Sequence, residues 1–274
     1  MIIKVRHIRI PLHVFKNEGN TVDELVEIDI RKEMKATQSN ELTMAAYTIS
    51  PTAKRCLWLA IAKLQEQTGG PACPVERDHW IDIRADDFSS LFLGGDVSGN
   101  AYRHIKDGCD ELLKTLVRVN KPTEKNPDGH IKWQIGSMAE YQEGSGVVRF
   151  RFHEKALPYV SRLPPGFTKI YLHGPAKLRS EYAQRLYEMM IQMRGAPGDL
   201  KFLELTVDEI RWRFQLGDKY PRFGDLNKWV IQQAVREIEQ KSNLTVEVKK
   251  IKQGREVKAL RFEFMESTQV DLFK

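Results

Sequence analysis

The sequence predicts an α+β protein in which one arrangement, helices followed by antiparallel strands, occurs twice. In the C-terminal half, helical periodicity at 180–194 is followed by a short strand, two more helices and a basic hairpin. In the N-terminal half, helical periodicity at 51–67 and 98–115 is followed by strand-like segments between 116 and 152. Helix, turn, second helix and hairpin is the order of a winged helix. We therefore expect two tandem winged-helix domains.

Local signals mark the ends of several segments. Ser50 followed by Pro51 is a helix start, and Thr206 followed three residues later by Glu209 is a capping-box pattern. We expect a polar linker at 32–41 and a bent, proline-rich connector at 153–178. The expected division is an N-terminal arm at 1–42, a first winged-helix domain at 43–170, a second at 171–265 and a C-terminal tail at 266–274.

The helix expected at 226–241 is the centre of the second domain. At 100° per residue, its apolar side chains fall on one arc and its long polar side chains on the opposite arc, with Trp229 beside them. Lysine and arginine donate to phosphate or guanine, glutamine suits adenine, and an α-helix fits the major groove. The apolar arc holds Val230, Ile231, Ala234, Val235 and Ile238, and the polar arc holds Lys228, Gln232, Gln233, Arg236 and Gln240.

The hairpin expected at 244–264 follows this helix. Apolar residues alternate along both of its strands. Its tip surrounds Gln253 and Gly254 and carries the basic residues Lys249, Lys250, Lys252, Arg255 and Lys258. A solvated hairpin tip would carry the same charges, but beside a donor-rich helix, contact with the DNA backbone is favoured.

The segment at 98–115 is a second helix-turn-helix candidate and is less basic. Its apolar side chains share one face, and Asn100, Arg103 and Lys106 are its candidate DNA contacts. In the second domain we assign base edges or nearby phosphates to the polar arc, and DNA backbone to the residues around the hairpin. The first group is Lys228, Gln232, Gln233 and Arg236, and the second is Arg222, Lys249, Lys250 and Arg255.

Composition narrows the class of protein. The chain has 274 residues, a formal net charge of +6, a pI near 9.1 and a mean hydropathy of −0.46. The basic balance modestly favours polyanion partners. Because no apolar run could span a bilayer and no signal peptide is visible, we expect a cytoplasmic, DNA-associated protein without a membrane partner. The three cysteines form no CxxC pair, so we expect no disulfide, no metal site and no cofactor.

An ordered series of blocks carries a family resemblance. The blocks are NAYRHIKDGCDELLKTLVRV and VVRFRFHEKALPYVSRLPPGFTKIYL in the first half, and LRSEYAQRLYEMM, LTVDEIRWRF, KYPRFGDLNKWVIQQAVREIEQKSNLTVEV and QGREVKALRFEF in the second. Together they resemble the iteron-binding plasmid replication initiators over roughly 45–265. The N-terminal arm lies outside this resemblance.

The resemblance implies a function that the spacing of residues does not show. It implies a protein that binds directly repeated sites at a plasmid origin as a monomer, through two winged helices. It also implies dimers formed through the first domain, repression of the protein's own promoter, opening of an adjacent AT-rich segment and recruitment of host helicase-loading proteins. It implies no catalytic residues.

The C-terminal tail carries a separate motif. Gln269-Val270-Asp271-Leu272-Phe273 resembles the pentapeptide that binds the bacterial sliding clamp. Leu272 and Phe273 can fill an apolar pocket while Gln269 anchors the other end by hydrogen bonds. A tail that folds back on its own domain is the alternative.

Three other functions stay open or are disfavoured. A winged-helix transcriptional repressor would share every DNA-binding feature and would prefer an inverted repeat at a promoter. A rolling-circle nicking enzyme is disfavoured because the sequence has no His-x-His pair, and ATP use is disfavoured because it has no P-loop. A scaffold that binds only the clamp would leave the donor-rich helix face unexplained.

Overall fold

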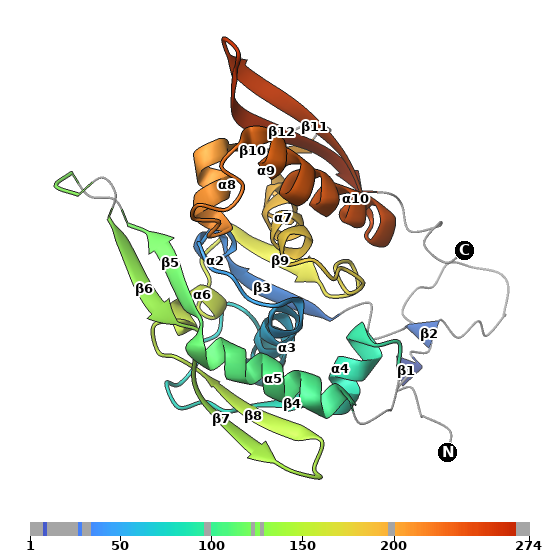
Figure 1. Cartoon of the computed structure of the whole chain (residues 1–274). Coiled ribbons are helices and arrows are strands. Elements are labelled where there is room, and N and C mark those ends of the chain that lie inside the picture. The colour runs from blue at the N-terminus through green and yellow to red at the C-terminus, as the bar shows by residue number, and fades with distance from the viewer. Residues whose placement is uncertain are drawn as a thin grey trace, which may run out of the picture.

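The structure is a computed structural model that describes residues 8–9, 27–28, 34–95, 100–121, 124–126, 129–196 and 201–266. Two winged-helix units follow one another along the chain, the first in blue to green and the second in orange to red (Figure 1). Helix α7 (Glu181–Gln192) lies between them.

The first unit has three helices and a three-stranded sheet. Its sheet has the strand order β4-β8-β7, all antiparallel. A second hairpin, β5–β6, lies in the chain between the last helix, α5, and strand β7. The elements are α3 (Pro51–Thr68), β4 (Ile81–Arg84), α4 (Ala85–Phe92), α5 (Asn100–Lys114), β5 (Leu116–Asn120), β6 (His130–Gln134), β7 (Gly136–Gln142) and β8 (Val147–Phe152).

The second unit repeats this plan. Its sheet order, β10-β12-β11, places the strand after the first helix beside the last strand, as in the first unit. The elements are α7, the 3₁₀ turn Met193–Gly195, β10 (Lys201–Thr206), α8 (Val207–Arg213), α9 (Phe223–Leu226), the π-helical segment η2 (Asn227–Ile231), α10 (Gln232–Lys241), β11 (Leu244–Gln253) and β12 (Glu256–Glu266). The predicted pair of winged helices is confirmed.

Two segments expected as linkers contain regular structure. The stretch 32–41 holds β3 (Lys35–Ser39) and the start of α2 (Asn40–Thr43), and the connector holds α6 (Leu157–Val160) and β9 (Phe167–Tyr171). Strands β3 and β9 pair antiparallel. The linker prediction was wrong because β3 buries polar side chains with partners: Gln38 Nε2 donates to Thr43 Oγ1 at 2.9 Å. Farther toward the N-terminus, β1 (Ile8–Arg9) pairs with β2 (Glu27–Ile28).

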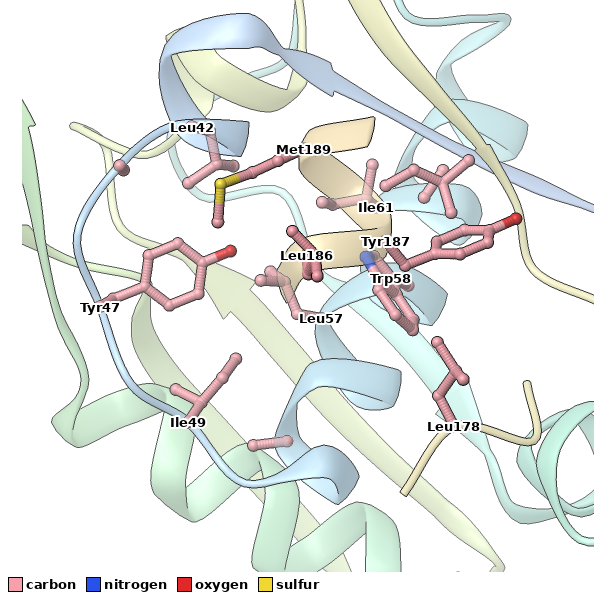
Figure 2. Close-up of a cluster of buried hydrophobic side chains, with 14 of the residues drawn as sticks. Leu42, Tyr47, Ile49, Leu57, Trp58, Ile61, Leu178, Leu186, Tyr187 and Met189 are labelled. Atoms are coloured by element: carbon pink, nitrogen blue, oxygen red, sulfur yellow. The ribbon is translucent and has the colours of Figure 1, made fainter. Parts of the chain in front are cut away.

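Helix α7 shares a core with the first unit. In Figure 2, side chains of α3 and α7 meet in one cluster, with residues of the 42–49 segment beside them. Met189 and Met190 of α7 are fully buried. The labelled members are Leu42, Tyr47, Ile49, Leu57, Trp58, Ile61, Leu178, Leu186, Tyr187 and Met189. The helix that opens the second unit is therefore anchored to the first.

A buried ionic cluster reinforces this joint. The Glu188 carboxylate lies 2.7 Å from Lys54 Nζ and 2.8 Å from Arg185 Nη1, and accepts from Trp58 Nε1 at 2.8 Å. Burial lowers the pKa of Lys54 to about 7. Burial acts to raise the pKa of Glu188, but the positive charges of Lys54 and Arg185 outweigh it and hold that pKa below its usual range. With two cations around one carboxylate, the lysine is the group that gives up a proton.

Candidate nucleic-acid interface

The helix from Phe223 to Lys241, formed by α9, η2 and α10, has the two predicted faces; we call it the recognition helix. Its apolar arc is buried: Val230, Ile231 and Ile238 are fully inaccessible, and Ala234 and Val235 nearly so. Its polar arc is exposed, and within the described chain these side chains make no hydrogen bond or ion pair with a neighbour. They are Lys228, Gln232, Gln233, Arg236 and Gln240.

The turn before this helix is organised by an arginine that the sequence did not reveal. The Arg211 guanidinium donates to the carbonyl oxygens of Gly217 at 3.0 Å, Lys219 at 2.9 Å and Tyr220 at 2.8 Å. Upstream, the predicted capping box of Thr206 and Glu209 is formed at the start of α8. Because one side chain satisfies three turn carbonyls, Arg211 holds together the turn that leads into the recognition helix. Periodicity carries no signal for such a contact.

The hairpin β11–β12 places its basic residues on two different faces. Lys250 Nζ lies 5.8 Å from the centre of the Phe223 ring, at the start of the recognition helix. Its neighbour Lys249 points to the other face of the sheet, where it bonds to Glu263 Oε2 at 2.5 Å, a contact that raises the pKa of Lys249. Arg222 occupies the N-cap position of α9 with its side chain exposed, and Arg255 lies exposed at the hairpin tip. Lys250 and Arg222 are therefore brought to the recognition helix, and Lys249 is not.

The corresponding helix of the first unit, α5, is tied to its own domain. Arg103 Nε lies 3.7 Å from Asp107 Oδ2 on the same helix, with both side chains exposed, and the half-buried Lys106 has its Nζ 5.6 Å from the centre of the Tyr141 ring on β7. Glu111 accepts from Ser50, from the backbone nitrogen at 2.6 Å and from Oγ at 2.5 Å. Asn100 is the exposed first residue of α5.

The other predictions concern the C-terminal tail motif, the cysteines, a metal site and a membrane span. Gln269, Leu272 and Phe273 of the tail motif lie outside the described residues. Cys56 and Cys109 are buried free thiols. Over the described ranges, no group of three or more His, Cys, Asp and Glu side chains is arranged to hold a metal ion. None of the helices in those ranges is long and apolar enough to cross a membrane.

Fold and surface together define a tandem winged-helix protein with one open, donor-rich recognition helix. The chain belongs to the family of initiator replication proteins: the family description "Initiator Replication protein, WH1" matches residues 35–191, and "Initiator Rep protein, WH2" matches residues 206–264. These two matches cover most of the chain: the first runs from β3 through α7, and the second from the end of β10 to β12.

Individual relatives agree with this assignment. The chain is 25% identical over 267 residues to the "PI protein" of Escherichia coli, covering 88% of this chain and 85% of the relative. It is 23% identical over 242 residues to a "Replication initiation protein" of Escherichia coli, covering 88% of this chain and 72% of the relative. The crystal structure of the Pi initiator protein in complex with iteron DNA has the same fold, with a TM-score of 0.70 at 23% identity over 86% of this chain and 98% of that chain.

Proposed function

We propose that this protein is a plasmid replication initiator that binds directly repeated origin sites, or iterons, through both winged helices. The observation that carries the proposal is the recognition helix, whose exposed polar arc makes no hydrogen bond or ion pair within the described residues while its apolar arc is buried. The iteron DNA named for the Pi initiator structure supports the same substrate class.

The proposed contacts divide by chemistry. Lys228, Gln232, Gln233 and Arg236 read base edges or nearby phosphates in the major groove. The basic residues around the turn and hairpin hold the DNA backbone, and α5 adds weaker contacts from the first unit. The backbone group is Arg222, Lys250 and Arg255, joined more weakly by Lys249 from the opposite face of the hairpin, and the α5 group is Asn100, Arg103 and Lys106. Two winged helices on one chain would lie on successive faces of the duplex, about one helical turn apart.

The wider role follows from the family. We propose that the domain at 171–265 is the main iteron-binding domain, and that the domain at 43–170 adds DNA contacts and forms homodimers in equilibrium with monomers. The bound monomer opens the origin and recruits host helicase-loading proteins on plasmid DNA in the cytoplasm, without catalysing a reaction itself. The protein also represses its own promoter.

A selection from random duplex DNA tests the substrate. The full chain would be incubated with a random-sequence library at low ionic strength, and the bound fraction sequenced. We expect direct repeats of one short site. Enrichment of a single inverted repeat would favour the transcriptional repressor instead, and enrichment of no sequence would overturn sequence-specific binding.

The tail motif makes a separate test possible. We propose that Gln269, Leu272 and Phe273 bind the bacterial sliding clamp, because a glutamine and a Leu-Phe pair fit an anchored apolar pocket. Removal of residues 269–274 should abolish clamp binding in a pull-down with purified clamp while leaving DNA binding unchanged. Clamp binding that survives this deletion would exclude the tail as the contact.

A further inference from the structure

An exposed tryptophan lies within the polar face of the recognition helix. Trp229 is 46% exposed, although it is one of the largest apolar side chains in the chain. It follows the exposed Lys228 directly and, like Gln232, Gln233 and Arg236, it is exposed, so it lies on the polar side of the helix. The core-facing neighbours Val230 and Ile231 are fully buried. Trp229 is therefore part of the surface that would face DNA, and no part of the core requires it.

Two local features hold this side chain in place. Lys228 Nζ lies 4.5 Å from the centre of the indole ring, a cation–π contact. The backbone here is the π-helical segment η2, in which the Gln232 N–H donates to the carbonyl oxygen of Asn227, five residues earlier. Single π turns are rare and occur frequently at functional sites. The widened turn carries Lys228 and Trp229 together at the start of the polar arc.

The chemistry of the ring limits what it can recognise. Arginine, lysine and glutamine on the same face suit the polar edges of guanine and adenine. An indole ring offers a broad apolar surface and one donor, and the apolar group exposed in the major groove is the C5-methyl of thymine. Packing against this methyl removes apolar surface of both partners from water.

We propose that Trp229 is a specificity-determining residue that packs its indole against the C5-methyl group of one thymine in the repeated site. This inference rests on the proposed function and adds a base preference that the polar side chains do not supply. It distinguishes Trp229 from Phe202, an aromatic residue that is 42% exposed beneath Arg261 but lies on the solvent face of β10, away from the recognition helix.

The test removes the methyl group without changing base pairing. Affinities would be measured for the duplex selected by the wild-type protein and for versions in which each thymine in turn is replaced by deoxyuridine. The wild-type protein should lose roughly fourfold in affinity at one thymine, the effect of one buried methyl group. Trp229→Ala should bind the thymine duplex more weakly and show no loss at that position. Trp229→Phe should keep part of the loss, and the matched control Phe202→Ala should behave as wild type.

The outcomes separate this inference from the proposed function. If the wild-type protein selects a repeat but is indifferent to deoxyuridine at every thymine, the methyl contact is excluded and the proposed function stands. If Trp229→Ala keeps the full thymine preference, another residue reads the methyl group and this inference fails. Within that outcome, an equal weakening of the thymine and deoxyuridine duplexes would mean that the ring packs on sugar or phosphate and not on the methyl group. If the wild-type protein selects no sequence, the proposed function fails together with this inference.

Discussion

Helix α5 and the recognition helix occupy the same place in the two winged-helix units, but their polar faces are used differently. On α5, Arg103 pairs with Asp107, Lys106 covers Tyr141 and Glu111 caps the start of α3 through Ser50. On the recognition helix, the polar arc is open to solvent. A repeated backbone plan therefore does not imply a repeated surface, because a side chain that already has a partner in its own domain must give up that contact before it can contact DNA.

Packing shows the same contrast. Gly108 in the middle of α5 allows close contact with α3, where an added Cβ would lie 2.5 Å from Cys56 Sγ. Gly224, near the start of the recognition helix, has no atom within 4 Å of the equivalent position. In the first unit and α7 these helix residues contact their own domain, whereas in the second unit one helix face stays exposed to solvent. The following substitutions test this division.

The largest effect is expected in the ionic cluster at the joint. Glu188→Ala leaves the buried Arg185 without its carboxylate and should lower the free energy of unfolding by about 3–5 kcal/mol. Urea denaturation measures this loss. The matched control is Glu204→Ala, because Glu204 lies 2.9 Å from Arg261 in a pair that is exposed on both sides, and should cost about 1 kcal/mol or less. Equal losses would mean that the joint contributes no more than a surface pair.

The same cluster predicts a pH dependence of stability. Burial lowers the pKa of Lys54 to about 7 in the folded protein, against about 10.4 in an unfolded chain. Between these values the unfolded chain holds a proton that the folded protein has lost. The free energy of unfolding should therefore rise with pH from about 7 to 10, by at most about 1.4 kcal/mol per pH unit.

Lys54→Met should remove this rise, since Arg185 and Glu188 still form a neutral pair. Urea denaturation of the wild type and the variant at several pH values between about 7 and 10 isolates the contribution of Lys54, because all other titrating groups are common to the two proteins. Curves of wild type and variant that stay parallel throughout the window would exclude Lys54 as its source.

Substitutions on the polar arc of the recognition helix should show the reverse pattern, with little effect on the free energy of unfolding and a large effect on DNA binding. Arg236→Ala should cost about 1–3 kcal/mol of binding free energy for the selected duplex and relax the choice of one base, if the guanidinium reads a guanine. Arg103→Ala on α5 should cost less, because Asp107 already pairs with Arg103. Fluorescence anisotropy with labelled duplexes compares them, and an equal cost for both would remove the distinction between the two helices.

The two glycines give a smaller test within the folded protein alone. Gly108→Ala forces a methyl group against Cys56 and should destabilise the protein by about 1–3 kcal/mol, as overpacking does. Gly224→Ala meets no atom and should be neutral or stabilise by up to about 1 kcal/mol through helix propensity. Thermal or urea unfolding of both variants measures the difference. A stabilising Gly108→Ala would show that α3 and α5 can move apart at little cost.

The sequence was sufficient for the features that repeat with a regular period or follow a local rule. The burial of Val230, Ile231 and Ile238 follows from helical periodicity, and the start of α8 from the Thr206–Glu209 capping pattern. The two winged-helix units were predicted from such features. Such features depend on neighbours in the chain and need no knowledge of distant contacts.

Features that depend on distant partners were not predictable. Strand β3 looked like a linker because its polar side chains are buried only with partners far along the chain, such as Glu188 for Gln38 at 3.2 Å. Arg211 looked like an ordinary basic residue until its three carbonyl partners were visible. The basic residues of the hairpin were predicted to act as one group for the same reason, because a run of lysines in the sequence does not show which lysine pairs with a carboxylate.

The two faces of the hairpin give the test with the smallest expected effect. Lys250 and Lys249 are adjacent in sequence, but Lys250 lies against Phe223 at the recognition helix and Lys249 bonds to Glu263 on the opposite face. Lys250→Ala should weaken binding to all sequences alike and lower the slope of log affinity against log salt by about one unit, as expected for one lost phosphate contact. Lys249→Ala should change the slope by less, because this lysine already has a carboxylate partner. Titrations at several salt concentrations measure both slopes, and a larger change for Lys249 would mean that the opposite face of the hairpin is the one that meets DNA.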